Sequence, residues 1–142
     1  MNYAIVFRLL GYILMIEGVL LLLPAVTSLI YAEWAVMGVF LLTAAISAAL
    51  GLGLRTIKPR SKVFYMREGF AATALSWIAI SIVGAVPFVL TGCIPNPVDA
   101  LFETVSGFTT TGASILPAVE GLPNGILFWR SFTHWIGGMG VL

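Results

Sequence analysis

Residues 109 to 114, Thr-Thr-Thr-Gly-Ala-Ser, form a small and hydroxylated segment in an otherwise apolar chain. Successive backbone carbonyls in such a segment can replace the hydration shell of K⁺. Gly112 permits backbone angles that other residues resist, so its carbonyl can turn toward an ion. The β-branched threonines stiffen the segment and add hydroxyl oxygens. The same composition is also typical of a turn that binds nothing, and the spacing alone leaves both interpretations open.

A short helix is predicted directly before this segment. Asn96 is a favourable N-cap, Pro97 suits the first helical position, and Asp99 lies in the first turn near the positive end of the helix dipole. A helix from Pro97 to Gly107 is about 16 Å long, roughly half of the hydrocarbon core of a bilayer. Irregular backbone at membrane depth occurs only inside protein or beside water. The pattern therefore predicts a re-entrant loop, with the negative end of the short helix facing a cation.

Long apolar runs predict the elements that position this loop. Of the 142 residues, 60% are hydrophobic and 9% are charged, whereas about 25% are charged in a typical soluble domain. A membrane span needs roughly 20 apolar residues. We expect spans at residues 3–31 (kinked at Pro24), 34–54 and 68–90, and a last helix that begins near Asn124 and is truncated at Leu142. The predicted fold class is therefore an all-α membrane protein.

The basic loop separates two predicted units of the chain and indicates how they are oriented in the membrane. We expect residues 1–67 to form a two-helix N-terminal extension with a basic loop, and residues 68–142 to form a helix, the re-entrant loop and a further helix that is incomplete; the resemblance described next implies that this second unit is a helix–pore loop–helix repeat. Positive loops stay cytoplasmic, so the N-terminus is expected inside and residues 109–114 on the outer side. The net charge of +1 gives no reason to expect a nucleic-acid partner. The basic loop contains Arg55, Lys58, Arg60, Lys62 and Arg67.

Two stretches resemble a known family. Residues 99–114, DALFETVSGFTTTGAS, and 127–142, LFWRSFTHWIGGMGVL, resemble the first pore repeat of the Trk/Ktr/HKT potassium transporter superfamily. The two extra helices before the repeat resemble its TrkH branch. The resemblance implies four potassium-channel-like repeats around one pore, each with a filter strand. It implies potassium coordination by Thr110, Thr111, Gly112 and Ala113, with Thr109 and Ser114 flanking them.

The resemblance also implies a function and partners. It implies potassium uptake across the plasma membrane of a bacterium or archaeon, by a transporter rather than an enzyme, with K⁺ as the transported ion and no organic cofactor in this chain. Implied partners are the lipid bilayer, a second full-length subunit, and a cytosolic nucleotide-binding regulatory subunit of the TrkA/KtrA type. Symport with H⁺ or Na⁺ and passive transport both stay open. One repeat supplies a quarter of each carbonyl ring, so we expect further repeats in missing sequence; a small subunit that tetramerises is the alternative.

Polar side chains near the loop allow more than one role. Glu103, one turn before the loop segment, either braces the filter by accepting backbone N–H bonds or faces water and attracts cations. Arg130 either snorkels toward the membrane surface or pairs with Glu103 or Glu120. The sequence does not decide between these alternatives.

Three further features are weighed separately. Ser114 and His134 are the nucleophile and base of an alternative intramembrane serine hydrolase, although the second glycine expected after such a serine is absent. Glu17 lies in the middle of a predicted span, where an acid is costly, so it is either functional or packed against a polar partner. The glycines of residues 137–140, GGMG, are predicted to let helices approach closely.

Overall fold

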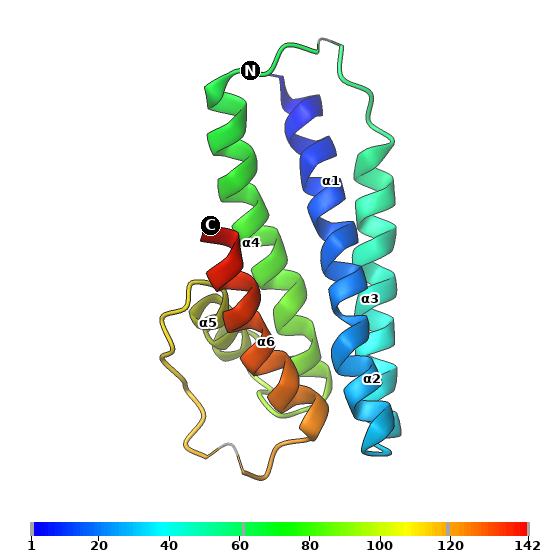
Figure 1. Ribbon diagram of the computed structural model, residues 1–142, viewed down its shortest axis with the longest axis vertical. Coiled ribbons are helices and arrows are strands. Elements are labelled where there is room, and N and C mark those ends of the chain that lie inside the picture. Colours follow the sequence, from blue (N-terminus) through cyan, green and yellow to red (C-terminus); the bar gives the residue numbers. More distant parts are fainter. Residues whose placement is uncertain (1, 61, 119, 142) are drawn as a thin grey trace.

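A computed structural model describes residues 2–60, 62–118 and 120–141 of the chain. All regular structure over these residues is α-helical. Long helices form an elongated bundle, and the two last helices pack against one half of it (Figure 1). The helices are α1 (Tyr3–Leu20), α2 (Leu22–Ile30), α3 (Trp34–Arg55), α4 (Met66–Leu90), α5 (Pro97–Phe108) and α6 (Asn124–Val141). The predicted all-α membrane fold is confirmed.

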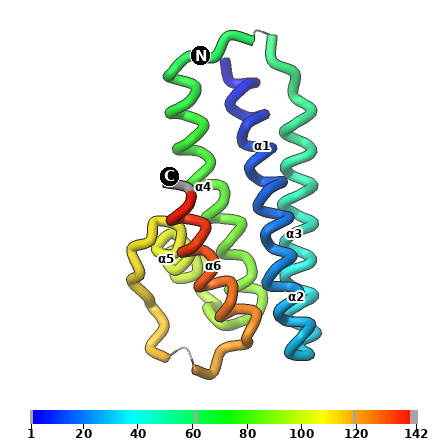
Figure 2. Tube along the Cα trace, viewed as in Figure 1, coloured from blue at the N-terminus to red at the C-terminus, as the bar shows by residue number. Residues whose placement is uncertain are grey.

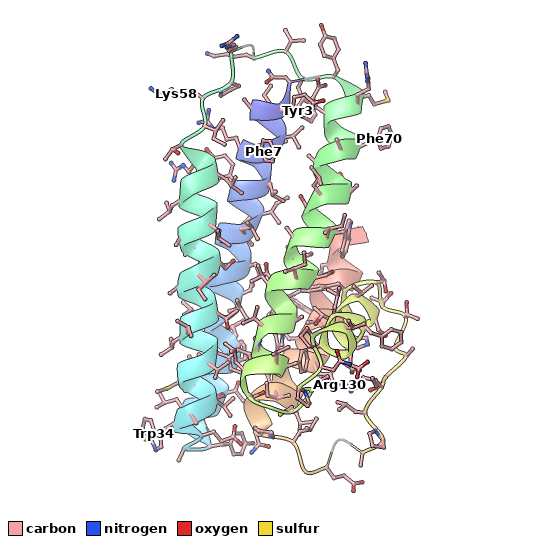
Figure 3. All side chains as sticks on the ribbon, turned by 180° about the vertical axis from the view of Figure 1, so that it is seen from behind. Tyr3, Phe7, Trp34, Lys58, Phe70 and Arg130 are labelled. Atoms are coloured by element: carbon pink, nitrogen blue, oxygen red, sulfur yellow. The ribbon has the colours of Figure 1, made fainter. Side chains whose placement is uncertain are left out.

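Three helical stretches of the described residues are long and apolar enough to cross a membrane: Tyr3–Ile30, Trp34–Arg55 and Met66–Leu90. They coincide closely with the predicted spans. The basic loop and the N-terminus lie at one end of the bundle, with Tyr3 and Lys58 close to that end and Trp34 at the opposite end (Figure 3). The helices therefore alternate in direction as the predicted topology requires. The division of the chain at residue 67 stays a prediction.

The first span is interrupted at Leu21, between α1 and α2. Pro24 lies shortly after the interruption and has no N–H to donate to the carbonyl of Leu20. The Ala25 N–H donates to the Leu21 carbonyl at 3.4 Å, a long hydrogen bond that marks the disturbed turn. α2 then continues in the same direction as α1, away from the end of the bundle that holds the N-terminus (Figure 2). The helix predicted over residues 3–31 is thus present, with its break ahead of the proline.

Small residues set the distance between α1 and α3. A Cβ atom at Gly51 would lie 2.6 Å from the Gly11 carbonyl oxygen, and one at Gly11 would lie 2.7 Å from the Gly51 carbonyl oxygen. The hydroxyl of buried Ser47 donates to the Leu14 carbonyl at 2.6 Å. Close approach through glycine is a common way for membrane helices to associate. The two helices therefore pack almost backbone to backbone.

Two carboxylates fasten this N-terminal pair to the later helices. Glu68, 2% exposed, accepts the Asn2 N–H at 3.0 Å and the Tyr65 N–H at 2.9 Å. α4 therefore begins at Met66, slightly earlier than predicted, because Glu68 satisfies N–H groups at its start. At the other end of the bundle, Glu33 accepts the backbone N–H groups of Asn124 at 2.8 Å and Gly125 at 3.1 Å. Glu33 thus caps α6 from the turn between α2 and α3.

An aromatic cluster holds α4, α5 and α6 together. Trp129 is fully buried, and its indole N–H donates to the Gly84 carbonyl at 3.0 Å. The rings of Phe40 and Phe108 both meet Trp129 edge-on, with ring centroids 6.3 Å apart in each pair. A Cβ atom at Gly84 would lie 2.9 Å from the Thr104 methyl group. The missing side chain at Gly84 therefore lets α5 sit directly on α4.

Candidate functional site

The loop segment, residues 109–114, follows a short helix that begins as predicted. Asn96 caps α5 with its side-chain oxygen, which accepts the Val98 N–H at 3.0 Å. α5 is 12 residues long, or about 18 Å. It continues through Gly107, which was predicted to end it, and ends at Phe108. Gly107 keeps an ordinary helical conformation and serves instead as the contact point for Thr133 of α6.

α5 and the loop segment form the re-entrant shape that the sequence predicts. α4 ends and α6 begins at the same end of the bundle (Figure 1). Between them, α5 lies at an intermediate depth, and the chain after it returns to that end (Figure 2). The residues from Thr109 to Ile115 are all exposed. The loop segment therefore presents its backbone on the surface of this chain.

Backbone N–H groups at the start of the loop segment point back to α5. The N–H groups of Thr110, Thr111 and Gly112 donate to the carbonyls of Gly107 or Ser106 at 3.0, 3.0 and 3.4 Å. In a trans peptide the carbonyl of the preceding residue points opposite to the N–H, and the described residues contain no cis peptide bond. The carbonyls of Thr109, Thr110 and Thr111 are consequently turned away from α5. Three successive acceptors face outward.

Two residues of the loop segment adopt left-handed backbone angles. Thr110 has φ of 56° and Gly112 has φ of 79°. This conformation costs a non-glycine residue about 1–2 kcal/mol, so glycine fits at 112 and Thr110 must be held by its surroundings. The Thr109 and Thr111 hydroxyls lie 2.8 Å apart, and the Thr109 hydroxyl donates to the Val105 carbonyl at 2.7 Å. These bonds restrain the threonines on either side of Thr110.

Ser106 binds the far side of the loop segment. Its buried hydroxyl donates to the carbonyl of Ala113. The Ala113 carbonyl is therefore turned toward the body of the chain, unlike the carbonyls of Thr109 to Thr111. The sequence interpretation did not single out Ser106. Its place three residues after Glu103 on the same helix face is the pattern that indicates a shared role.

Glu103 is the centre of the contacts behind the loop segment. The residue is 4% exposed. Its carboxylate accepts the Ser114 hydroxyl at 3.1 and 3.0 Å and the Ile115 N–H at 3.2 Å. The Ser114 hydroxyl oxygen also accepts the Leu116 N–H at 3.1 Å. Of the two roles considered for Glu103, the geometry is that of a buried carboxylate behind the loop rather than a water-facing acid.

Arg130 of α6 completes this cluster. Its Nε–H donates to the Glu103 carboxylate at 2.6 Å, with the two side chains 23% and 2% exposed respectively. The partner is Glu103 and not Glu120, which is exposed. A buried charge of this kind is tolerated when its partner and hydrogen bonds satisfy it. The pair therefore places no net charge behind the loop segment.

α6 also supports the end of α5 through glycine. A Cβ atom at Gly137 would collide with the backbone of Phe108, whereas Gly138 has open space around it. The close approach predicted for the glycines of GGMG is thus present at Gly137 and absent at Gly138. α5 and the loop segment rest on α6 through Gly137, Thr133 and Arg130.

The residues of the alternative hydrolase do not form a nucleophile–base pair. The Ser114 hydroxyl is bonded to Glu103. The Nδ1 atom of His134 lies 3.0 Å from the Arg130 carbonyl of its own helix. A general base must lie within hydrogen-bond reach of its nucleophile. This arrangement does not support acyl-transfer chemistry.

Glu17 lies apart from the loop cluster, in the first span. It is 4% exposed, and neither of its carboxylate oxygens has a hydrogen-bond partner among the described residues. The polar partner considered for it is therefore not found in that part of the chain. A carboxylate without partners is costly to bury.

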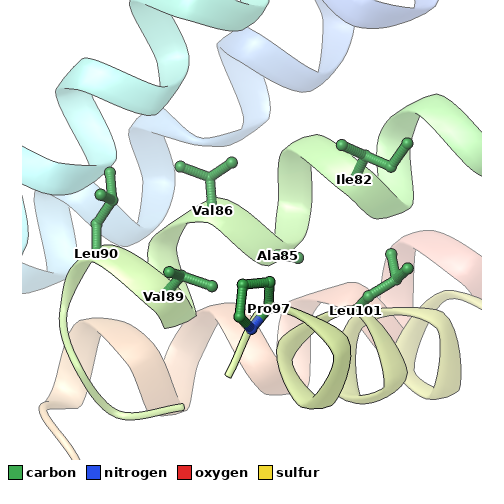
Figure 4. A pocket seen from close by; sticks show the side chains of 7 residues that line it. All are labelled: Ile82, Ala85, Val86, Val89, Leu90, Pro97 and Leu101. Carbon is green, nitrogen blue, oxygen red and sulfur yellow. The ribbon is translucent and has the colours of Figure 1, made fainter. Parts of the chain in front are cut away.

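A pocket between α4 and α5 is lined by side chains that carry no oxygen atoms to bind a cation. It is a cavity of about 420 Å³ between α4 and the start of α5, and Figure 4 shows its lining. The lining residues are Ile82, Ala85, Val86, Val89, Leu90, Pro97 and Leu101. An alkali cation requires oxygen ligands. The outward carbonyls of the loop segment are therefore the better candidates for ion contact.

Comparison with known proteins gives a consistent result. The family TrkH, described as cation transport proteins, matches residues 32–142. An uncharacterized cation transporter of Methanocaldococcus jannaschii is 38% identical over 138 residues, which cover 96% of this chain and 28% of that relative. The Trk system potassium uptake protein TrkH of Halomonas elongata is 35% identical over 148 residues, which cover all of this chain (100%) and 30% of the relative.

A third relative has the same coverage. The Trk system potassium uptake protein TrkH of Escherichia coli K12 is 35% identical over 147 residues, covering 100% of this chain and 30% of the relative. The chain thus spans 28% to 30% of the length of these relatives.

Proposed function

Because this chain belongs to the TrkH family of cation transport proteins, we propose that it is part of a potassium uptake protein and that residues 109–114 line the ion path. The family consists of transporters rather than enzymes. The observation that carries the proposal is the run of outward carbonyls at Thr109, Thr110 and Thr111, held from behind by α5. The relatives in Halomonas elongata and Escherichia coli are named potassium uptake proteins.

The proposed role of the loop segment is to replace water around K⁺. A ring of carbonyl oxygens can take the place of the hydration shell when enough oxygens are presented in a suitable shape. This segment contributes one part of such a ring, and three further repeats contribute the others. The greater length of the relatives favours repeats within one chain over four copies of a small subunit.

The side chains behind the loop segment would preserve that shape. Glu103 and Ser106 bind Ser114 and Ala113 from the protein side, and they leave the outward carbonyls free for an ion. The C-terminal end of α5, which is buried directly behind the loop segment, adds partial negative charge near the same place. An inside-negative membrane potential then drives entry by about 2.3 kcal/mol per charge per 100 mV.

The contacts also refine the ligand set. Among the implied ligands, Thr110 and Thr111 are the better supported, because their carbonyls face outward, whereas the Ala113 carbonyl is bonded to Ser106. Thr109 and Ser114 flank them and stabilise the segment through their hydroxyls. In this proposal Ala113 fixes the geometry of the filter rather than contributing a fully free oxygen.

Partners and orientation complete the proposal. We propose a plasma-membrane protein with a cytoplasmic N-terminus, since the basic loop lies at the same end as the N-terminus. The family resemblance further suggests a dimer of full-length subunits and a cytosolic nucleotide-binding regulatory subunit. The coupling of transport to H⁺ or Na⁺ is left open.

The test is a glycine substitution in the open reading frame that encodes this chain, expressed in bacteria that lack their own potassium uptake systems. Gly112→Ser should lower the ratio of K⁺ uptake to Na⁺ uptake, because a serine at φ of 79° strains the segment at its proposed ligands. Uptake of both ions is measured with the protein amount held equal.

Gly92→Ser is the matched control. Gly92 also has a positive φ, 75°, and open space around it, but it lies outside the loop segment. The substitution imposes similar backbone strain and should leave the ion ratio unchanged. Equal ratios in wild type and Gly112→Ser would remove the filter role, and absence of any potassium uptake by the wild type would remove the transport proposal.

A further inference from the structure

An apolar groove runs along the exposed face of the α1–α3 pair. Its volume is about 600 Å³. Large side chains form its walls, including Ile16, 59% exposed, and Val19, 65% exposed. The floor is hollow because Gly18, Ala44 and Ala48 carry little or no side chain. The groove is thus a by-product of the small residues that bring the two helices together.

The length of the groove matches one leaflet of a bilayer. Along the first span it reaches from Tyr12 of α1 to Leu22 at the start of α2, which corresponds to about 15 Å at 1.5 Å per residue. The hydrocarbon core of a bilayer is about 30 Å thick. A single acyl chain that descends from one membrane surface would therefore fill the groove from end to end.

Positive charge lies at one end of the groove. Tyr12 and Leu52 line that end, and Arg8 and Arg55 lie about one helical turn beyond them toward the N-terminus and the basic loop. The Arg55 guanidinium carbon is 5.5 Å from the centroid of the Tyr12 ring, and both guanidinium groups lie near the Tyr12 hydroxyl. Two positively charged side chains therefore lie close together at one end of the apolar groove.

Among the described residues, neither Arg8 nor Arg55 forms a salt bridge with a carboxylate. The salt bridge found in that part of the chain joins Arg130 and Glu103. Guanidinium groups bind phosphate oxygens strongly, often through two parallel hydrogen bonds. The pocket between α4 and α5 in Figure 4 has a similar apolar lining, but no arginine or lysine lines it. The groove on α1 and α3 therefore combines two features that only an amphiphile with a negative head group would satisfy together.

We propose that this groove binds an anionic phospholipid, with one acyl chain between α1 and α3 and the phosphate on Arg8 and Arg55. The inference is independent of the ion path, since it uses none of the residues around the loop segment. The head group lies at the end of the bundle that carries the basic loop, and therefore in the leaflet on that side. The lipid fills a hollow surface between α1 and α3.

The experiment is native mass spectrometry of the purified, delipidated protein after addition of phosphatidylglycerol or phosphatidylcholine with identical acyl chains. Phosphatidylglycerol should remain bound at lower concentration than phosphatidylcholine. Arg8→Gln/Arg55→Gln should weaken phosphatidylglycerol binding about tenfold or more, given the typical contribution of a basic residue at an anionic surface. Lys58→Gln/Arg60→Gln removes the same charge from the basic loop and should change binding by less than about twofold.

A second pair of variants tests the acyl chain. Ala45→Phe places a ring in the groove and should weaken binding of both lipids, whereas Ala49→Phe, also at an exposed alanine of α3 but not in the lining, should not. Size-exclusion profiles check that each variant is folded. Equal retention of the two lipids, or retention unaffected by either the arginine or the Ala45 change, would overturn the proposal. Loss of potassium uptake with lipid binding intact would count only against the transport function.

Discussion

The α1–α3 pair and the unit formed by α4, α5 and α6 solve different packing problems. In the first, glycine and alanine bring two helices together, and the Ser47 hydroxyl donates a hydrogen bond from one helix to the Leu14 carbonyl of the other. In the second, Glu103, Ser106 and Arg130 cluster behind a loop that has no regular structure. The contrast indicates where polar side chains are required inside a membrane protein.

The reason lies in the backbone. A helix satisfies its own N–H and carbonyl groups, so two helices need only complementary shape to associate. Residues 109–114 cannot do so, because the carbonyls of Thr109 to Thr111 are turned outward and the remaining groups need partners from neighbouring residues. Side chains of α5 and α6 supply those partners. The cost is a buried ion pair, and removal of either member would leave the other charge without its partner.

The largest effect is expected when the polar cluster loses its centre. Glu103→Ala removes the acceptor of Ser114 and Ile115 and leaves Arg130 without its partner. We expect a loss of about 2–4 kcal/mol in stability, since Arg130 is partly exposed and water relieves some of the cost. The thermal unfolding temperature in detergent and the rate of potassium uptake should both decrease.

Glu120→Ala is the control for that change. Glu120 lies in the same connection but is exposed, and its loss should alter neither property. A Glu103→Ala protein with unchanged unfolding temperature and unchanged ion ratio would show that the loop keeps its shape without the cluster.

The next largest effect is expected in the α1–α3 pair, whose association depends on complementary shape. Gly51→Ala places a Cβ atom 2.6 Å from the Gly11 carbonyl oxygen and 3.0 Å from the Met15 nitrogen, so α1 and α3 must separate. We expect a loss of about 1–3 kcal/mol, typical of overpacking, while the ratio of K⁺ to Na⁺ uptake stays unchanged. Gly53→Ala on the same helix has open space and should be neutral or slightly stabilising. Altered selectivity in Gly51→Ala would mean that the two regions are coupled.

A smaller change sharpens the role of the loop's second anchor. Ser106→Ala releases the Ala113 carbonyl and should cost about 1 kcal/mol. The ion ratio should fall less than in Gly112→Ser. Ser76→Ala is matched to it, because Ser76 is buried but bonds only within its own helix, to the Ala72 carbonyl at 2.6 Å. If the two serine variants prove equal in ion ratio, Ser106 serves stability alone.

The smallest effect is expected at Glu17. Glu17→Gln replaces a buried acid, whose oxygens have no partner in the described part of the chain, with an amide of the same size that cannot carry a charge. The unfolding temperature should stay the same or rise, and the ion ratio should not change. Glu33→Gln should instead lower the unfolding temperature, because Glu33 accepts two N–H groups of α6. A changed ion ratio in Glu17→Gln would connect the first span to the ion path.

Much of the fold follows from local properties of the sequence. The apolar runs predict the spans because their length and lack of charge depend on no other part of the chain. Asn96 and Pro97 predict the start of α5 for the same reason, since a cap acts within its own first turn. The left-handed angle at Gly112 is likewise a local preference. The family resemblance added a function for the segment that these features left ambiguous.

Tertiary structure alone decided which side chains meet. The sequence left Glu103 and Arg130 each with several roles, and the packing of α6 on α5 through Gly137 brings them to 2.6 Å. The partner of Ser106 and the orientation of the Ala113 carbonyl were not predicted, because they depend on how the chain folds back after Thr110. Likewise, Glu33 caps a helix 91 residues further along the chain. Contacts between distant segments depend on how the helices pack, and they cannot be predicted from the order of residues along a single helix.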